Sequence, residues 1–245
     1  MTPSVTPRGL VFGTVAETYE RFRLGYPDEV VERTVRYAGT PVRTALEVGA
    51  GTGKATRAFA SRGIAVTAVE PDPEMYSVLE RETLGMPVTP VRSTYEAYDG
   101  PPVDLLYAAS AMHWTEAATR WTHAADLLVP GAAVAVFGTE MRLVDDGVQD
   151  GFERARSRFL PDDRYVHEPL EGLGESGLFT DVTEEVLPRH VLMPQREFVG
   201  YLSTVSAYLM LPMALQPQAF AAVADALPDE VWVDVTVHLN LARRV

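Results

Sequence analysis

Residues 44–138 alternate short apolar runs with stretches of helical periodicity, and this alternation limits the possible folds more than any other feature of the sequence. The apolar runs are rich in β-branched residues and lack polar alternation, which is typical of strands buried on both faces. Strand–helix–strand units repeated at this spacing predict a parallel sheet covered by helices on both faces, a doubly wound α/β fold. The predicted strands are residues 45–48, 64–69, 88–91, 103–108 and 132–137, and the predicted helices are residues 52–61, 73–84 and 114–128.

The segments on either side of this core predict further elements. A helical leader at residues 15–37 is interrupted at Gly25-Tyr26-Pro27. After the core we expect a helix at 145–158, a Pro- and Gly-rich stretch at 161–177, a strand at 179–187, a helix at 196–211 and a strand at 231–241. We expect one domain over residues 1–245, divided into an N-terminal helical cap (1–40), a core (41–140), a lid and insertion (141–230) and a terminal strand (231–245).

The charge of the chain narrows its partners. With 21 Lys and Arg against 34 Asp and Glu, the formal net charge is −13 at pH 7. Nucleic-acid binders need Lys and Arg to neutralise phosphates, so a nucleic-acid partner is disfavoured. An anionic membrane surface is disfavoured for the same reason.

The composition also excludes several kinds of chemistry and targeting. The chain has no cysteine, which excludes disulfides, thiolate nucleophiles and cysteine-ligated metals. Its five histidines are scattered without metal-ligand spacing, so no metal site is expected. No apolar run approaches the roughly 20 residues of a transmembrane helix, and the first residues lack the apolar core of a signal peptide. We expect a soluble, cytoplasmic protein.

The most informative segment is a turn with glycines at alternate positions in residues 49–53, between a predicted strand and a predicted helix. Such glycines let the backbone pass close to a ligand and leave amides available to an anionic group. A dinucleotide-binding fingerprint needs glycine where Lys54 stands. A P-loop needs glycine in place of Val48 and Ser or Thr in place of Ala55. Both of these alternatives are therefore weakened.

The pattern that remains resembles motif I of the class I S-adenosylmethionine-dependent methyltransferases, an acidic residue followed by x-Gly-x-Gly-x-Gly. The match is Glu47, Gly49, Gly51 and Gly53, and Glu70 supplies the acidic residue that this family has at the end of the second strand. The resemblance implies a Rossmann-like fold with a mostly parallel seven-stranded sheet, S-adenosylmethionine as cofactor and S-adenosylhomocysteine as product. It also implies that the Glu70 carboxylate accepts hydrogen bonds from both ribose hydroxyls. The alternative for Glu70 is a solvated charge at the end of a strand.

The leader extends the resemblance to a small-molecule subgroup that includes relatives of trans-aconitate methyltransferase. The residues that carry it are Phe12, Ala16, Tyr19, Arg23 and Tyr26-Pro27. In that group the leader helix closes over the cofactor, which implies that Tyr19 and Arg23 approach the methionyl carboxylate. The alternative is that Tyr19 packs and Arg23 pairs with a surface acid.

Two later segments also resemble this subgroup. Residues 91–96 resemble the turn beside adenine, and residues 104–114 resemble the fourth strand with its trailing His113-Trp114. Ser110 stands where many relatives have Gln, so the amide contact of those relatives is not expected here. The resemblance as a whole assigns cofactor binding to Tyr19, Arg23, Glu47, Gly49, Ala50, Gly51, Gly53, Glu70, Pro71, Met75, Ser93, Thr94, Tyr95, Ala109 and Ser110.

Methyl transfer from a sulfonium needs an aligned nucleophile in a dry pocket, and a general base only when the acceptor has a proton to lose. His113 follows the fourth strand, where the resemblance places the methyl group, and histidine suits a base for a phenol or an activated hydroxyl. The alternative is a structural histidine. The residues predicted to contact the substrate are Tyr26, Trp114, Tyr201 and Tyr208. For the two later tyrosines the alternative is packing of an amphipathic helix.

We expect transfer of a methyl group from S-adenosylmethionine to an oxygen or carboxyl group of a small molecule, such as a secondary metabolite. A nucleic-acid methyltransferase is disfavoured because the chain lacks the Asn/Asp-Pro-Pro-Tyr motif and any cysteine, and because its charge is acidic. The alternative function is a cofactor-binding fold without methyl transfer, serving as a scaffold or in another reaction such as cyclisation.

Overall fold

The computed structural model describes residues 12–160 and 172–245. They form two compact units, a sheet unit and a helical unit. The sheet unit holds residues 25–139, 172–187 and 237–245, and the helical unit holds residues 12–24, 140–160 and 188–236. The division of one domain into cap, core, lid and terminal strand stays a prediction. Residues 161–171 of the Pro- and Gly-rich stretch lie outside the described residues.

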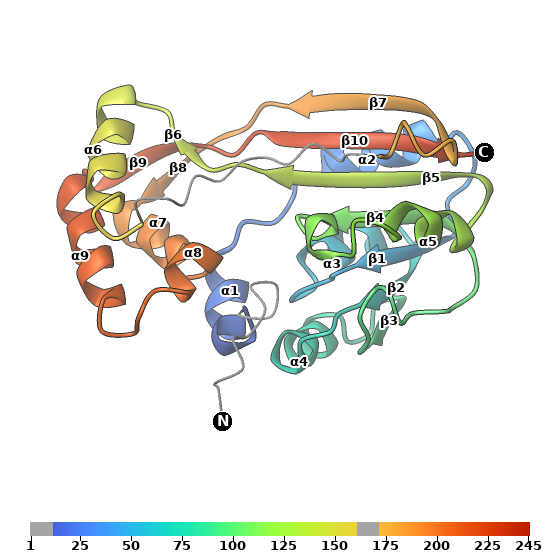
Figure 1. Ribbon diagram of the computed structural model, residues 1–245, viewed down its shortest axis with the longest axis horizontal. Helices are drawn as coiled ribbons and strands as arrows, with labels where there is room; N and C mark the ends of the chain where they lie inside the picture. The colour runs from blue at the N-terminus through green and yellow to red at the C-terminus, as the bar shows by residue number, and fades with distance from the viewer. Residues whose placement is uncertain (1–11, 161–171) are drawn as a thin grey trace. The chain divides into compact units, whose positions relative to one another are not determined.

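The sheet unit is built on a seven-stranded sheet with the order β3-β2-β1-β4-β5-β10-β7 (Figure 1). Its strands are β1 (Thr44–Val48), β2 (Ala65–Val69), β3 (Val88–Val91), β4 (Val103–Ala109), β5 (Leu128–Thr139), β7 (Phe179–Leu187) and β10 (Val237–Arg244). Strands β1 to β5 are parallel. Strand β10 runs antiparallel to both β5 and β7. The predicted Rossmann-like, mostly parallel sheet is confirmed.

Helices cover both faces of this sheet, as the two-sided burial of its strands requires. Helices α2 (Asp28–Ala38) and α3 (Lys54–Ala60) pack on one face, α5 (Arg120–Asp126) packs on the other, and α4 (Pro73–Glu82) follows β2. Successive residues of β4 point to opposite faces. Leu105 and Tyr107 join the core under α2 and α3, whereas Leu106 and Ala108 join the core under α5.

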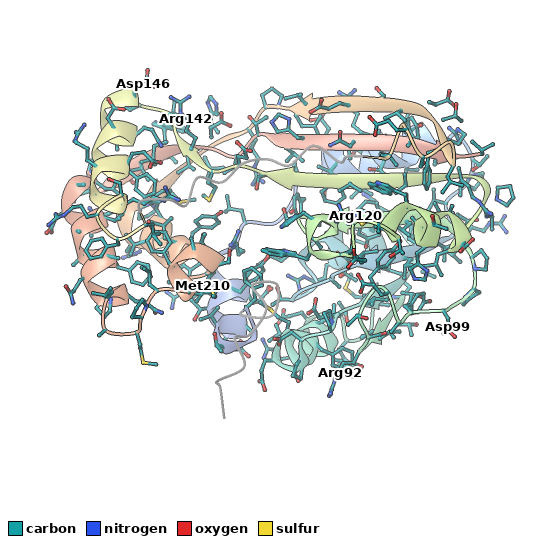
Figure 2. The ribbon with its side chains drawn as sticks, viewed as in Figure 1. Arg92, Asp99, Arg120, Arg142, Asp146 and Met210 are labelled. Carbon is teal, nitrogen blue, oxygen red and sulfur yellow. The ribbon has the colours of Figure 1, made fainter. Side chains whose placement is uncertain are left out.

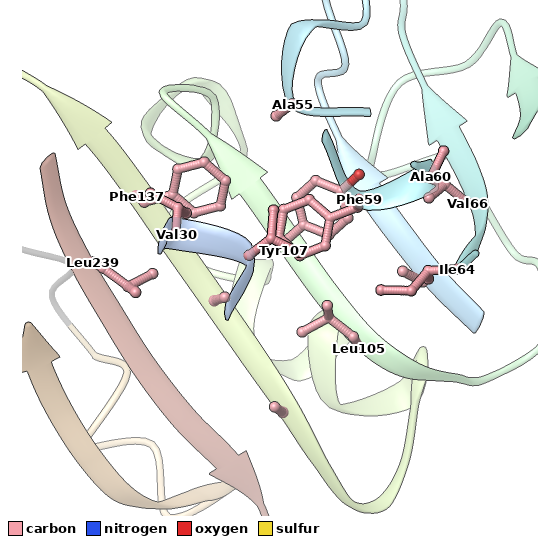
Figure 3. Packing of buried hydrophobic residues seen from close by; sticks show 14 of the residues in the cluster. Val30, Ala55, Phe59, Ala60, Ile64, Val66, Leu105, Tyr107, Phe137 and Leu239 are labelled. Carbon is pink, nitrogen blue, oxygen red and sulfur yellow. The ribbon is translucent and has the colours of Figure 1, made fainter. Parts of the chain in front are cut away.

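Aromatic rings fill the centre of the core under α2 and α3. Figure 3 shows Phe59 of α3 beside Tyr107 of β4, with ring centroids 4.0 Å apart and planes 18° from parallel. Phe137 of β5 continues the stack, 6.3 Å from each of them. Offset stacking of this kind adds about 0.5–1.5 kcal/mol per pair to the burial of the rings. This cluster joins α3, the helix that begins at the glycine turn, to the middle of the sheet.

The helical unit contains a small antiparallel sheet with the order β6-β9-β8 and several helices. Its elements are η2 (Phe12–Val15), α1 (Ala16–Phe22), β6 (Arg142–Leu143), α6 (Asp146–Arg156), β8 (His190–Pro194), α7 (Gln195–Leu202), α8 (Ser206–Leu209), α9 (Gln216–Ala226) and β9 (Glu230–Asp234). An ion pair of 2.8 Å between Arg142 and Asp146 joins β6 to the start of α6 (Figure 2). The sequence patterns predicted α6 but missed β6, β8 and α9.

The predicted terminal strand at residues 231–241 is wrong, because the structure divides it between the two units. Strand β9 ends at Asp234, and β10 begins at Val237 in the seven-stranded sheet. Asp234 accepts hydrogen bonds from both the amide and the hydroxyl of Thr236, at 2.9 and 2.6 Å, and this local turn interrupts the strand. The apolar alternation continues across the turn, so periodicity alone does not reveal it.

The predicted helix at residues 196–211 is also wrong, because it is broken into α7 and α8. The Thr204 hydroxyl donates to the Tyr201 carbonyl at 2.7 Å, a local bond that competes with helix continuation. Val205 then adopts an extended backbone before α8 begins.

The predicted helix at residues 114–128 is shorter than expected. Residues Met112–Trp114 form the 3₁₀ helix η3, and α5 begins only at Arg120. The amide and hydroxyl of Thr115 both donate to the Met112 carbonyl, at 3.1 and 2.7 Å, and close the 3₁₀ turn. Among the described residues, no helix combines the length and the apolar character that a transmembrane span requires.

Arg243 on the last strand ties three segments of the sheet unit together. Its Nη2 donates to the Tyr37 carbonyl at 2.7 Å, and its Nη1 donates to the carbonyls of Ala38 and Gly131 at 3.0 and 2.8 Å. Tyr37 and Ala38 are the last residues of α2, whose final carbonyls have no partner within the helix. The guanidinium therefore caps α2 and holds it to β10.

We expect Arg243→Ala to lower the free energy of unfolding by about 2 kcal/mol, because hydrogen bonds from a charged donor contribute more than neutral ones. Urea denaturation measures this change. Arg243→Lys should recover part of the loss, since an ammonium reaches fewer carbonyls. The matched control is Arg36→Ala, which removes an exposed arginine of the same helix and should change stability by less than about 0.5 kcal/mol.

Candidate functional site

The carboxyl ends of the parallel strands meet at one edge of the sheet. Val48 of β1 is level with Val69 of β2 and with Ala108 of β4. Val69 is in turn level with Val91 of β3, after which comes the exposed Arg92 (Figure 2). The chain leaves β1 toward β2 and β3 and then returns to place β4 on the other side of β1. Open α/β sheets bind ligands at such a reversal of strand order.

The glycine turn after β1 has three residues in the left-handed region, with φ of 65° at Gly49, 58° at Gly51 and 87° at Gly53. A Cβ at Gly49 would lie 2.6 Å from the Cβ of Ala111, and one at Gly53 would lie 2.8 Å from Leu79. Gly49 is therefore required by packing as well as by backbone conformation, whereas Gly53 is required by its backbone conformation. A Cβ at Gly51 would meet nothing within 4 Å, so Gly51 borders open space.

Glu70 lies beside this turn and is bound to it. One carboxylate oxygen accepts the Gly51 amide at 2.7 Å, and the other accepts the Asp72 amide at 2.9 Å. The side chain is buried, and burial raises the pKa of Glu70 to about 7. Of the two alternatives for this residue, the structure therefore excludes a solvated charge at the end of a strand.

Asp72 fixes the segment that follows Glu70. It is the N-cap of α4, and its Oδ1 accepts the amides of Glu74 and Met75 at 2.9 and 3.1 Å. The predicted cofactor residue Pro71 is half-buried between the two acids, and Met75 is buried in the first turn of α4. The hydrogen bonds of Asp72 thus link Glu70 and Met75, two of the predicted cofactor residues, on either side of it.

Glu47, the acidic residue of the predicted motif, bonds to the core of the sheet unit. Its Oε2 accepts the Thr56 hydroxyl of α3 at 2.5 Å and the Tyr107 hydroxyl of β4 at 3.0 Å. Burial, and to a smaller extent the charge of Glu70, raises the pKa of Glu47 to about 8. These contacts join β1, which precedes the glycine turn, to α3 and to β4. The prediction assigned Glu47 to cofactor binding and did not include this structural role.

The turn after β3 is anchored by Tyr95. This side chain is buried, and its hydroxyl donates to the carbonyl of Arg120 at 2.9 Å. The Tyr95 carbonyl is 2.9 Å from Nε2 of His123, so both ends of the residue are held by α5. Ser93 and Thr94 precede it in partly or fully exposed positions. Tyr95 therefore positions the predicted adenine turn from within the core.

The turn after β4 carries the remaining predicted residues of the sheet unit. Ala109 ends the strand, and Ser110 has a left-handed φ of 53°. The Ser110 hydroxyl is 3.0 Å from the hydroxyl of Tyr26, which lies just before α2. The His113 and Trp114 rings follow in η3 with their centroids 4.5 Å apart, and Trp114 is 42% exposed. The structure thus brings predicted cofactor, substrate and base residues to one sheet edge.

The other predicted residues lie in the helical unit. The Arg23 guanidinium donates to the Thr204 hydroxyl at 2.8 Å, to the Thr204 carbonyl at 2.9 Å and to the Tyr201 hydroxyl at 3.2 Å. It also lies over the rings of Tyr19 and Tyr201, 5.0 and 4.4 Å from their centroids. Tyr208 is buried and stacks on Phe220 of α9 at 5.4 Å, which favours the packing interpretation for that residue. Their proximity to the glycine turn stays a prediction.

Residues 45–131 match the family model described as a methyltransferase domain. An uncharacterized methyltransferase of Mycobacterium bovis is 36% identical over 137 residues, which make up 56% of this chain and 55% of that protein. A protein of the same description from Mycobacterium tuberculosis gives the same values. The chain spans about half the length of these curated relatives.

Solved structures share the architecture. A proposed type II methyltransferase from Anaeromyxobacter dehalogenans has a TM-score of 0.66 at 24% identity, over 91% of this chain and 98% of that chain. Phosphoethanolamine N-methyltransferase 2 of Haemonchus contortus, solved in complex with S-adenosyl-L-methionine, has a TM-score of 0.58 at 15% identity, over 98% of this chain and 60% of that chain. At these identities the likeness shows the fold.

The chain is therefore similar to methyltransferases over residues 45–131, and it shares their Rossmann-like fold. The further resemblance to relatives of trans-aconitate methyltransferase stays a prediction. Three residues that build the candidate site, namely Thr56, Ala111 and Asp72, were not predicted as site residues. Only Asp72 had a local signal, an aspartate directly before Pro73 at the start of a helix. No group of metal-ligating side chains occurs in the part of the chain that the structure describes.

The two buried acids of the candidate site, Glu47 and Glu70, predict how stability depends on pH. Both pKa values lie above the ordinary value of 4.5, at about 8 for Glu47 and about 7 for Glu70. The folded state therefore retains protons that the unfolded state releases, and the stabilisation is complete below pH 4.5 and lost as the pH rises to about 8. We expect the ligand-free protein to lose about 5 kcal/mol of unfolding free energy between pH 5.5 and pH 8 through these groups, about 3 kcal/mol through Glu47 and about 2 kcal/mol through Glu70.

Urea denaturation across this pH range is the measurement. Glu47→Gln keeps an oxygen to accept from Thr56 and Tyr107 but cannot titrate, so its profile should be flatter. Glu74→Gln, an exposed acid of α4, is the matched control and should retain the slope of the unmodified protein. An equally steep profile for Glu47→Gln would show that the buried acid is not the titrating group.

Proposed function

We propose that this protein transfers a methyl group from S-adenosylmethionine to an oxygen or carboxyl group of a small molecule. The observation that carries the proposal is the bond between the Gly51 amide and the buried Glu70 carboxylate at the reversal of strand order. The match to a methyltransferase domain over residues 45–131 covers both residues. A class I cofactor site needs a glycine turn and an acidic residue at the same edge of the sheet, and Gly51 and Glu70 supply these two features.

The residues present fit S-adenosylmethionine. Gly51 borders open space, so a ligand can approach the backbone of the turn without a clash. Each oxygen of Glu70 accepts a backbone amide at 2.7 or 2.9 Å and has a further lone pair for a ribose hydroxyl. Glu70 would hold the ribose, residues 49–51 the methionyl part, and Ser93 and Thr94 the adenine side. The cofactor supplies an electrophilic methyl group on a sulfonium.

The acceptor side is assigned to the turn after β4. Trp114 presents an exposed ring and lies against His113, and Tyr26 presents a hydroxyl beside Ser110. An aromatic wall with a few polar groups is typical of small-molecule sites. The net charge of −13 works against phosphate-rich acceptors such as nucleic acids. His113 would remove the proton of a hydroxyl acceptor.

Isothermal titration calorimetry with S-adenosylmethionine tests the cofactor site. We expect micromolar-range binding, weakened about tenfold in Glu70→Ala because a charge-assisted acceptor of two hydroxyls is lost. Glu74→Ala removes an exposed acid four residues away and should bind as the unmodified protein does. If the unmodified protein gives no binding heat, the proposed function is wrong.

A screen with labelled methyl donor over carboxylic acids, phenols and amines, read by mass, tests the transfer step. With a hydroxyl acceptor, His113→Ala should lower turnover about a hundredfold while the affinity for S-adenosylmethionine stays within about twofold. His238→Ala, which removes a half-buried histidine of β10 that contacts Glu184, serves as the control. Binding of the donor without transfer to any compound would instead support the alternative, a cofactor-binding fold that does not transfer methyl groups.

A further inference from the structure

Ser110 adopts a backbone conformation that serine rarely takes. Its φ is 53°, and Asp181 is the other non-glycine residue with positive φ among those the structure describes. Side chains with a Cβ are strained in this region, and such strain is often concentrated at functional sites. A glycine would relieve it, as the three glycines of the turn after β1 do. Compared with glycine, serine adds a hydroxyl that can form hydrogen bonds. This hydroxyl is therefore the group to which a function of the strained residue can be assigned.

The hydroxyl of Ser110 is held in one place from several sides. It lies 3.0 Å from the hydroxyl of Tyr26. The Tyr26 ring meets Phe137 edge-on with centroids 4.8 Å apart, and the Phe137 carbonyl accepts the Ser110 amide at 2.8 Å. A Cβ at Gly138 would come within 3.0 Å of the Ser110 oxygen, so the absence of a side chain there makes room for the hydroxyl. Phe137 and Gly138 of β5 thus place the hydroxyls of Tyr26 and Ser110 next to each other.

The hydroxyl pair lies at the sheet edge that holds the candidate site. Ala111, the next residue, packs so closely on the glycine turn that Gly49 can have no side chain. Ser110 is exposed and Tyr26 is half-buried, so a ligand can reach both hydroxyls. His113 and the exposed Trp114 follow in the same turn. The pair is therefore placed beside the groups assigned to the acceptor.

We propose that Tyr26 and Ser110 bind the acceptor oxygen and stabilise the negative charge that develops on it, so that the acceptor is a phenol. Hydroxyl groups that are already oriented stabilise an oxyanion without the cost of reorganising solvent. The exposed ring of Trp114 offers an aromatic acceptor a surface to stack on. This assignment moves Ser110 from the cofactor to the acceptor, and it rests on the proposed function.

Transfer to a phenol breaks one O–H bond and one S–C bond and forms one C–O bond. The phenol O–H bond breaks and its proton goes to His113. One hydroxyl of the Tyr26–Ser110 pair donates to the phenolate oxygen and accepts the proton of the other hydroxyl, and the phenolate oxygen forms the new bond to the methyl carbon. The bond between sulfur and the methyl carbon breaks, and its electron pair stays on sulfur. The products are a methyl aryl ether and S-adenosylhomocysteine, with the protonated histidine to be neutralised by solvent.

Binding of 4-nitrophenol to the protein saturated with S-adenosylhomocysteine tests the proposal, because its phenolate absorbs visible light and no transfer takes place. We expect the apparent pKa of the bound phenol to fall below that of the free phenol, so that the phenolate fraction at a pH below the free pKa rises several-fold. Tyr26→Phe keeps the ring contact with Phe137 and Ser110→Ala keeps the backbone, and each should reduce the shift. Tyr37→Phe and Ser61→Ala remove hydroxyls that donate to carbonyls elsewhere in the sheet unit and should leave it unchanged.

A methyl-transfer assay with labelled S-adenosylmethionine completes the test, with 4-nitrophenol, benzoate and benzylamine as acceptors. Transfer to the phenol should fall about tenfold in Tyr26→Phe and in Ser110→Ala, mainly in kcat. Ser110→Gly should melt no lower than the unmodified protein, since it relieves the strained backbone while losing the hydroxyl. This variant keeps the test usable if Ser110→Ala folds poorly.

The outcomes separate this proposal from the proposed function. A phenol that does not bind, a pKa that does not shift, or a shift that is equal in the variants overturns the hydroxyl pair as an oxyanion site. Transfer to benzoate or benzylamine alone overturns the phenol as acceptor but leaves methyl transfer in place. Failure of S-adenosylmethionine to bind in calorimetry would instead contradict the proposed function itself.

Discussion

The hydrogen bond from the Gly51 amide to the buried Glu70 carboxylate is the interaction on which the rest of the site depends. It joins the turn after β1 to the end of β2. Gly51 has a left-handed backbone there, and the Asp72 amide donates to the other carboxylate oxygen. Burial disfavours the ionised acid, as the raised pKa of about 7 indicates. A ligand that donates hydrogen bonds to this carboxylate offsets part of that cost. The turn and the acid are therefore one site and not two neighbouring features.

A second buried acid, Glu47, holds the helix that follows the glycine turn in place and lowers the stability of the folded protein. Glu47 receives the hydroxyls of Thr56 and Tyr107, which fixes the first residues of α3 against β4. A glutamine could accept the same two bonds without the desolvation that raises the pKa of Glu47 to about 8. The folded protein thus carries two carboxyl groups that it would hold more easily in protonated form. Such local destabilisation is common where a site has to be ready for a ligand before the ligand arrives.

The sheet and half of the site could be predicted because their signals are local. The strand at residues 45–48, the glycine turn and the spacing to Glu70 follow from short stretches of sequence and from the edge that parallel strands share. The contacts of Glu47 could not be predicted, since Tyr107 is 60 residues away and reaches it only through the sheet. The break between α7 and α8 likewise involves Thr204, which also receives a hydrogen bond from Arg23, 181 residues earlier. The prediction of one continuous strand over residues 231–241 failed for the opposite reason. A local turn divides the strand there but leaves the apolar alternation of the sequence intact.

The leader supplies predicted residues to both units, Tyr19 and Arg23 to the helical unit and Tyr26 to the sheet unit. Residues 23–26 connect the two units, and each end is held by an aromatic contact and by hydrogen bonds within its own unit. Arg23 donates through all three guanidinium nitrogens to Tyr201 and Thr204, while Tyr26 contacts Phe137 and Ser110. A carboxylate bound to Arg23 would therefore share the guanidinium with these partners and would meet a side chain already fixed between two rings. The arginine is held in one conformation before any ligand binds, so the ordering of a long side chain would add little to the cost of binding.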